Sequence, residues 1–266
     1  DVSANTALID LWCNGNQLTY LNMKNGVTDA LDSFNAINNS LDCIEVNEED
    51  VDWATENWTY ENGNIDEGVE FSVVCSVPEG YTYVPDNNFE QALVDLGYDS
   101  AVDDLVLTEN INGVTTLNID SLSISDLTGI EDFTSLSNLD CSYNSLDTLD
   151  VSSNTSLTDL LCNDNQLTSL DVSNHTALTK LDCGSNSLTS LDISNNTGLT
   201  YLDCNGNNLT SLDISNNTGL TNLRFAYNGV TSLDVSNHTA LEFLYCGPNP
   251  LTVLDVSNNT ALTGLS

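Results

Sequence analysis

The sequence predicts a solenoid of short stacked repeats with little helix, and three observations support this fold class. Residues 114–266 align on themselves with a period of about 21 residues. Each unit carries leucine at two fixed positions, then a cysteine or phenylalanine of the kind usually found in protein interiors, and then an asparagine. The second half of each unit is rich in Ser, Asn, Asp and Thr, whose side chains compete with helical hydrogen bonds.

The apolar column indicates how the interior is filled. It consists of Cys141, Cys162, Cys183, Cys204, Phe225 and Cys246. The phenylalanine indicates that this position requires apolar bulk rather than sulfur chemistry. In-register neighbours on parallel strands project side by side, too far apart for disulfides, and no CxxC spacing typical of a zinc site occurs. We therefore expect free buried thiols, no metal site and no cofactor.

Each unit reads LxxLxCxxNxL, which resembles the leucine-rich repeat. The resemblance covers residues 114–266 and resumes at 1–41. It implies a curved, right-handed solenoid with one parallel β-strand per coil. It also implies a ladder of asparagine side chains that bind backbone groups in the turns, formed by Asn144, Asn165, Asn186, Asn207, Asn228 and Asn249.

Further stretches of the sequence indicate which leucine-rich-repeat proteins this chain resembles. Residues 124–146 resemble the start of internalin-type bacterial repeats. The combination of VPDNNFEQAL, LTSLDVSNNTALT and a Cys–Trp segment is similar to secreted or surface leucine-rich-repeat proteins of marine Bacteroidetes. This resemblance implies export and a role in adhesion or binding.

The repeat columns break between residues 42 and 113, which divides the chain into four segments. We predict the end of a first repeat array, its C-terminal cap, a helical N-terminal cap, and a second array that continues beyond the chain end. Their boundaries are 1–42, 43–80, 81–113 and 114–266. A solenoid end exposes apolar surface, which is why each array requires a cap.

Each cap has its own sequence signal. Cys43 and Cys75 bracket the first cap and lie outside the cysteine column, so we predict a disulfide between them and an oxidising compartment. In the second cap, Asp86 or Asn87 starts a helix and Gly97 ends it. Four apolar residues line one face of that helix, namely Phe89, Ala92, Leu93 and Leu96.

The second half of each unit predicts a further short extended segment, because Leu170 and Val172 alternate with polar residues. A Ser–Asp–Ser pattern recurs on this flank, as at residues 169–173. The favoured interpretation is that each aspartate accepts backbone N–H bonds in its own turn. The alternatives are a cation-bridged or self-associating face and, less favoured, ice binding. Unpaired carboxylates stacked about 5 Å apart would repel one another.

The residues that change between repeats are candidates for ligand binding. They flank each strand core and face outward on the predicted concave side. In the late repeats they bring aromatic side chains and an arginine together, which are residue types that anchor partners. We predict a binding site at Tyr201, Asp203, Asn222, Arg224, Tyr227, Phe243 and Tyr245. The alternative is neutral variation on a solvated surface, with aromatics folded over the end of the array.

Charge excludes several partners. The 266 residues include 40 acidic and 3 basic residues, for a net charge of −37. This charge opposes nucleic acid and anionic membrane surfaces. No apolar run approaches the roughly 20 residues that cross a bilayer. Adaptation to a salty or extracellular medium is the favoured reason for the acidity, and divalent-cation uptake is less favoured because no calcium-loop spacing is evident.

No arrangement of catalytic residues is evident in the sequence. His175 and His238 recur in one column and are interpreted as turn residues. We therefore predict a non-enzymatic, secreted or cell-surface module that recognises a protein or glycan. The alternative hypothesis is a building block of a surface fibre that binds copies of itself.

Overall fold

Leucines at the repeat spacing build one long sheet in the computed structural model, which describes all of residues 1–266. The chain divides into two units, Asp1–Pro78 (unit 1) and Glu79–Ser266 (unit 2). This division falls close to the predicted boundary between the two caps. The predicted solenoid, with a long parallel sheet and little helix, is confirmed.

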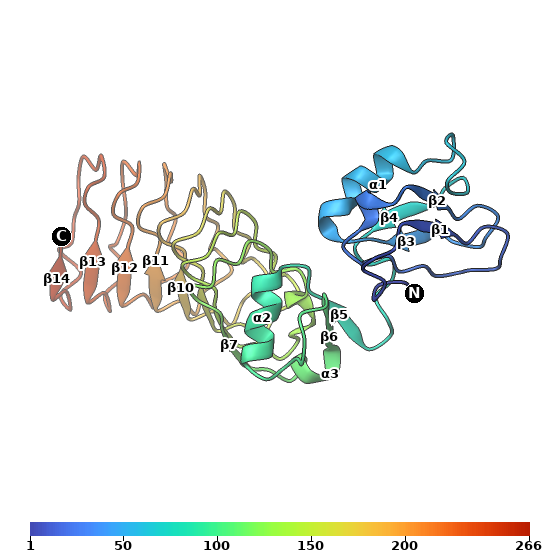
Figure 1. The fold of residues 1–266 in the computed structure, drawn as a ribbon. Helices are drawn as coiled ribbons and strands as arrows, with labels where there is room; N and C mark the ends of the chain where they lie inside the picture. The colour runs from blue at the N-terminus through green and yellow to red at the C-terminus, as the bar shows by residue number, and fades with distance from the viewer. The chain divides into compact units, whose positions relative to one another are not determined.

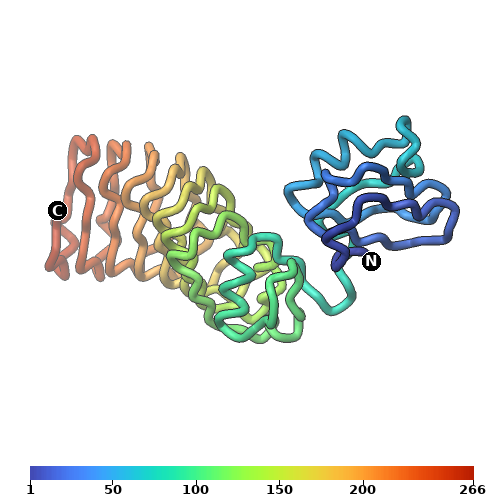
Figure 2. The backbone as a smooth tube through the Cα atoms, in the orientation of Figure 1, coloured from blue at the N-terminus to red at the C-terminus, as the bar shows by residue number.

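Unit 2 contains eight parallel strands in strict sequence order (Figure 1). Each contributes one coil, and the coils lie side by side along the array (Figure 2). Each central leucine pairs with the leucine of the next coil, as Leu202 does with Leu223. The strands are β7 (Thr116–Asn118), β8 (Asn138–Asp140), β9 (Asp159–Leu161), β10 (Lys180–Asp182), β11 (Tyr201–Asp203), β12 (Asn222–Arg224), β13 (Phe243–Tyr245) and β14 (Gly264–Leu265).

A helical cap precedes β7, as predicted. It consists of β5 (Tyr81–Tyr83), α2 (Asn87–Asp95), β6 (Leu105–Leu107) and α3 (Thr108–Ile111), and β5 pairs antiparallel with β6. Asp86 is the N-cap of α2, because its Oδ1 accepts the N–H groups of Asn88 and Phe89. Gly97 follows the helix with φ of 80°. Leu96 departs from the predicted apolar face, since it is 46% exposed at the helix end.

The core of unit 2 is continuous from the cap to the last coils. The central leucines of β8 to β13 are fully buried, and all five cysteines of the column are buried free thiols, as predicted. Burial raises the pKa of the Cys141 thiol to about 12 and raises that of Cys162 well above its usual value. These thiols are therefore protonated and unreactive packing groups.

The second half of each repeat is not a strand. Leu170 and Val172 are buried as their alternation predicts. However, the backbone groups that follow bind locally: Ser173 N–H donates to Asp171 Oδ1, and His175 N–H donates to the Val172 carbonyl. The same Asp–Ser contact recurs in later coils and lowers the pKa of each aspartate. These turns consume the hydrogen bonds that an inter-strand ladder would require.

Unit 1 combines short parallel pairs with one helix. Strands β1 and β2 pair with each other, as do β3 and β4. A disulfide joins Cys43 to Cys75, and Trp58 packs against Phe34 with ring centroids 4.2 Å apart. The elements are β1 (Asp10–Trp12), β2 (Ser33–Asn35), β3 (Cys43–Glu45), α1 (Val51–Asn57) and β4 (Glu70–Ser72), with 3-10 turns at Thr28–Ala30 and Glu48–Asp50; a third such turn, Ile130–Asp132, lies in unit 2.

Candidate ligand-binding face

The asparagine column ties neighbouring coils together beneath the candidate site. Asn207 Nδ2 donates to the carbonyls of Cys183 and Cys204, at 3.0 and 3.2 Å. Its Oδ1 accepts the N–H of Leu188 at 2.9 Å. The same pattern recurs at Asn165, Asn186, Asn228 and Asn249. Because each amide joins two neighbouring coils, the strands that carry the variable side chains form a rigid platform.

A second ladder supports the opposite flank, and sequence reasoning missed it. Asn217 Nδ2 donates to the carbonyls of Ile193 and Asn196. His175 and His238 belong to this ladder, since their Nε2 atoms donate to carbonyls of earlier coils and both rings are about 1% exposed. The interpretation as simple turn residues was incomplete. A column that holds either Asn or His at the repeat spacing was the available signal.

Side chains at the first and third positions of each strand point to the outer side of the long sheet, here called the strand face. Arg224 on β12 lies between two tyrosine rings of the flanking strands. Its guanidinium carbon is 5.8 Å from the ring centre of Tyr201 and 5.0 Å from that of Tyr245. On the other side of Tyr201, Lys180 Nζ lies 5.5 Å from the centre of the same tyrosine ring. Cations and rings therefore alternate across four adjacent strands.

Two aspartates complete this group, which we call the Arg224 cluster: Lys180, Asp182, Tyr201, Asp203, Arg224 and Tyr245. Asp203 Oδ2 lies 3.7 Å from Arg224 Nη1. Burial, followed by the neighbouring Asp203, raises the pKa of Asp182 to about 6. Burial and both aspartates raise the pKa of Tyr201 to about 12. The cluster therefore concentrates polar groups of both signs on a partly dehydrated surface.

The remaining predicted site residues are less closely associated with this cluster. Asn222 contacts the cluster, because its Oδ1 accepts a hydrogen bond from Arg224 Nε at 3.2 Å. Tyr227 lies past the strand in a turn with φ of 55°, where its side chain is 68% exposed. Phe243 lies over Gly264 of β14, so close that a Cβ there would be 2.8 Å from the ring. Lys180 and Asp182 were absent from the predicted set, although both stood among the variable positions.

Asp182 makes unit 2 sensitive to pH. Its native pKa is above the ordinary value, so the folded state binds its proton more tightly than the unfolded chain does. The resulting loss of stability grows as pH rises from about 4 to about 6 and persists above that range. We expect Asp182→Asn to stabilise unit 2 by about 1–2 kcal/mol at pH 8, after allowance for solvent screening, and to have little effect at pH 4.

Urea denaturation of both proteins at the two pH values measures this difference. Asp213→Asn is the matched control, because backbone and side-chain bonds from Ser215 lower the pKa of Asp213. This control should not stabilise the protein at pH 8. Equal stability of wild type and Asp182→Asn at pH 8 would contradict the prediction.

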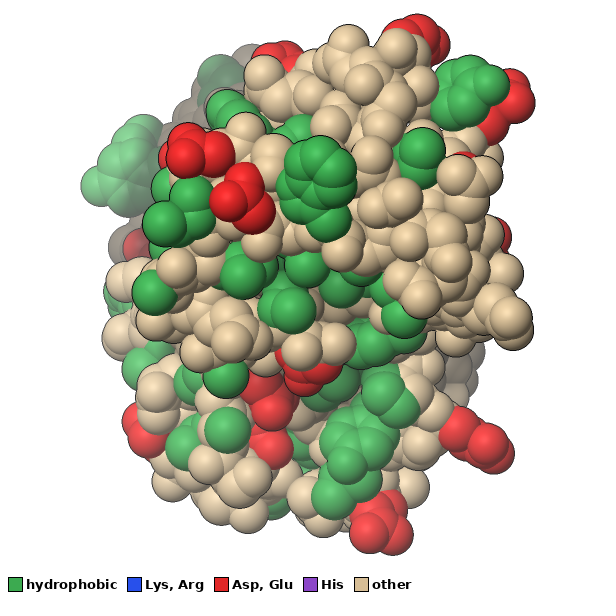
Figure 3. Space-filling model, turned by 45° about the vertical axis from the view of Figure 1, so that its right-hand side comes forward, with side chains coloured by type: hydrophobic (Ala, Val, Ile, Leu, Met, Phe, Trp, Pro, Cys, Tyr) green, Lys and Arg blue, Asp and Glu red, His purple; other side chains and the backbone are tan.

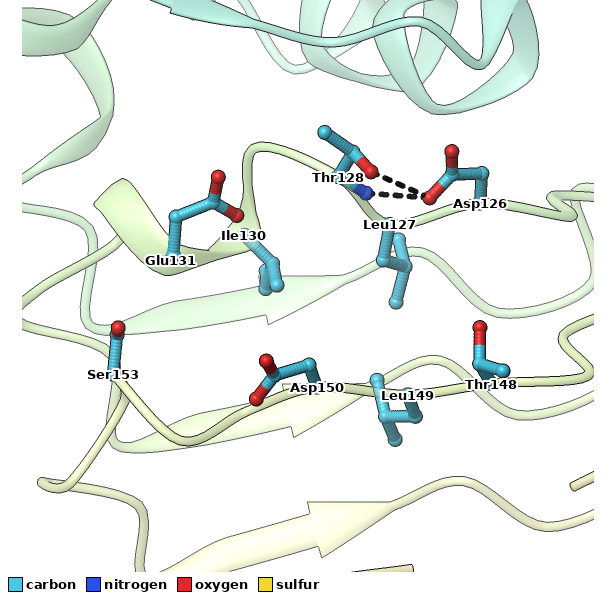
Figure 4. A pocket seen from close by; sticks show the side chains of 9 residues that line it. All are labelled: Asp126, Leu127, Thr128, Ile130, Glu131, Thr148, Leu149, Asp150 and Ser153. Carbon is cyan, nitrogen blue, oxygen red and sulfur yellow. Dashed lines mark hydrogen bonds between the residues drawn. The ribbon is translucent and has the colours of Figure 1, made fainter. Parts of the chain in front are cut away.

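A separate hollow of about 440 Å³ lies between two early coils of unit 2 (Figure 4). Its carboxylates are engaged in local turns. Asp126 Oδ1 accepts the N–H and hydroxyl of Thr128, as Figure 4 shows. Asp150 accepts the N–H of Ser152, and Glu131 accepts that of Gly129. This arrangement supplies neither a nucleophile with a base nor a paired acid and base.

The distribution of basic residues distinguishes the strand face. Figure 3 shows a face of the molecule with scattered acidic side chains and no visible Lys or Arg. Of the three basic residues in the chain, Lys180 and Arg224 both belong to the Arg224 cluster, and Lys24 lies in unit 1. No helix of the structure is both long enough and apolar enough to span a bilayer.

Comparison with known proteins identifies the repeat type. The structure of the functional domain of internalin J from Listeria monocytogenes, described as including a cysteine ladder, has 38% identity and a TM-score of 0.61. The match covers 70% of this chain and 47% of that structure. This chain carries internalin-like leucine-rich repeats. The internalin J sequence of strain F2365 is 38% identical over 72 residues, or 27% of this chain and 8% of that protein.

Two more distant structures share the fold alone. Internalin C2 of L. monocytogenes has 19% identity and a TM-score of 0.57, with 72% of this chain and all of that structure covered. A leucine-rich-repeat protein of Leptospira interrogans has 19% identity and a TM-score of 0.56, with 99% and 61% covered. These relatives do not support the resemblance to marine Bacteroidetes. A family model for the LVIVD repeat matches residues 242–264.

The internalin-like repeats agree with two of the predictions. The family's leucine-rich-repeat domains are non-enzymatic, as predicted for this chain. Internalin relatives are surface or secreted proteins that typically act in binding. The chain spans about half the length of the internalin J structure, so the activity and partners of the whole protein belong to the proposal below.

Proposed function

We propose that the strand face between β10 and β13 binds a protein ligand at the surface of the cell or outside it. The observation that carries this proposal is the row of alternating cations and tyrosine rings in the Arg224 cluster. In a chain with a net charge of −37, two of three basic residues lie in this one row. Arginine and tyrosine are residue types that dominate binding energy in protein interfaces.

The geometry of Arg224 suits recognition. Its side chain is 38% exposed, and its contact with Asp203 is a single long ion pair. The guanidinium group has five N–H donors in a planar fork, so donors remain for a ligand carboxylate or carbonyl. The rings of Tyr201 and Tyr245 hold the guanidinium plane of Arg224 in position. This packing reduces the side-chain entropy that Arg224 loses on binding a ligand.

The wider organisation supports the same role. We propose that residues 43–80 close the first array and that 81–113 begin the second, so that the binding face lies on a capped solenoid. The Cys43–Cys75 disulfide is the kind of bond that persists in oxidising compartments, which supports export. A glycan is the alternative ligand class, because tyrosine rings also stack on sugars.

A screen of the full chain against protein and glycan arrays tests this proposal. We expect Arg224→Ala and Tyr245→Ala each to weaken binding at least about tenfold, which corresponds to about 1.4 kcal/mol. Lys24→Ala is the control for charge, since Lys24 lies in unit 1, and it should bind normally. Equal binding by wild type and both cluster variants would contradict the proposed site.

The fibre hypothesis predicts a different result. Electron microscopy of the intact protein should then show ordered polymers, and Arg224→Ala would have no effect on ligand arrays. Lone curved monomers, together with a ligand lost on substitution of Arg224, would support the binding module.

A further inference from the structure

The cap of unit 2 contains three carboxylates that converge from two elements. Glu90 belongs to α2, whereas Asp99 and Asp103 belong to the loop that leads to β6. One oxygen of each group lies within 4.8 Å of the others. Residues 79–113 include no Lys, Arg or His, so no basic side chain of this segment neutralises the three acids.

Glu90 is the feature that points to a ligand. Its side chain is fully buried. Oε1 accepts the N–H groups of Asp103 and Leu105, each at 3.0 Å, which anchors the carboxylate head at the loop. Glu90 Oε2 is also buried but has no hydrogen-bond partner. Asp99 Oδ2 is likewise a buried oxygen without a hydrogen-bond partner. Two unpartnered oxygens beside a third carboxylate are costly without a positive charge between them.

We propose that Glu90, Asp99 and Asp103 bind one calcium ion. Calcium takes oxygen ligands at 2.3–2.6 Å, so oxygens that share an ion lie at most about 5 Å apart. The observed spacing satisfies this limit. Magnesium requires shorter bonds and a stricter octahedron, which three carboxylates from a helix and an irregular loop match less well.

The loop itself has part of the pattern of a known calcium loop. Counted from Asp99, the fifth residue is Asp103, and acidic ligands occupy the first and fifth positions of the EF-hand loop. The sixth residue, Asp104, has φ of 69°, the left-handed conformation that the EF-hand glycine adopts at this position. Ala101 and Asn110 replace ligands at the third and twelfth positions. Sequence reasoning found no calcium loop because Glu90 comes from the preceding helix.

The ion would join α2 to the loop before β6 and thereby stiffen the cap that covers the first coils of unit 2. An alternative state has a proton on Glu90, because burial raises the pKa of this carboxyl. That state would leave the protein indifferent to calcium, which makes the two states distinguishable.

Calorimetric titration of the full chain with calcium chloride, in about 0.15 M NaCl to screen diffuse acidic binding, tests the proposal. We expect one calcium ion per chain with Kd in the range of extracellular modules, about 1 mM or tighter. About 5 mM calcium should raise the Tm of unit 2 by several degrees over the protein in EDTA, whereas equal magnesium should raise it less.

Glu90→Gln should lose this ion or weaken it at least tenfold, and Asp103→Asn, an exposed change that spares the fold, should do the same. Asp95→Asn on the exposed side of α2 is the matched control and should bind as wild type does. Circular dichroism confirms that each variant is folded. Identical titrations of wild type and Asp103→Asn, or no calcium-dependent shift of Tm, would overturn the proposal.

Discussion

Replacing Asn207 with alanine is expected to lower the free energy of unfolding of unit 2 by about 3 kcal/mol. The Leu188 N–H loses its partner, and it is a buried donor. An orphaned buried donor costs about 1–3 kcal/mol, and the two lost bonds to carbonyls add about 1 kcal/mol each at most. The carbonyls of Cys183 and Cys204 each keep a bond from a neighbouring asparagine, which limits the loss.

Urea denaturation followed by far-UV circular dichroism measures this change. Asn208→Ala is the matched control, because Asn208 is an exposed neighbour, and it should change stability by less than about 0.5 kcal/mol. Tryptophan emission should not follow the Asn207→Ala effect, because all three tryptophans lie in unit 1. A loss below about 1 kcal/mol would indicate that water replaces the amide and that the ladder is not a buried structural element.

Loss of the Cys43–Cys75 disulfide is expected to destabilise unit 1 by about 3–4 kcal/mol. The bond closes a loop with a sequence separation of 32 residues, which restricts the unfolded chain. Unit 1 has only 78 residues and a small core, so this is a large share of its stability. The double variant Cys43→Ser/Cys75→Ser should therefore unfold at much lower urea.

Tryptophan fluorescence reports on this transition, since Trp53 and Trp58 pack together in unit 1. Dithiothreitol should shift the wild-type transition and leave that of the double variant unchanged. The free thiols of unit 2 are the internal control, because they are buried and reduced in both proteins. A double variant as stable as wild type would contradict the prediction.

Repeat spacing explains how much of the candidate site was predictable. A residue and its equivalent about 21 positions later occupy adjacent strands, so sequence alone placed Arg224 near Tyr201 and Tyr245. The same spacing places Lys180 beside Tyr201, although Lys180 was absent from the predicted site. It could not separate Tyr227, which turns away after the strand, from the ring stack.

The calcium proposal marks a different limit. Glu90 stands on the polar side of a pattern whose apolar residues predicted helix α2 correctly. Its burial depends on the loop that folds back over it and donates two N–H groups to one oxygen. A local pattern does not show which acidic side chain such a loop will cover.

By itself, the sequence determined the solenoid, its buried leucine and cysteine columns, and a cap helix that starts at Asp86 or Asn87. These features follow from a strict period, because every coil must bury the same positions against its neighbours. Only the tertiary structure decided which polar groups lose water: the histidines of the second ladder, Asp182 within the Arg224 cluster, and Glu90 in the cap. Their burial depends on contacts between coils and loops that are distant in sequence, and the cost of dehydrating a polar group is set by those contacts.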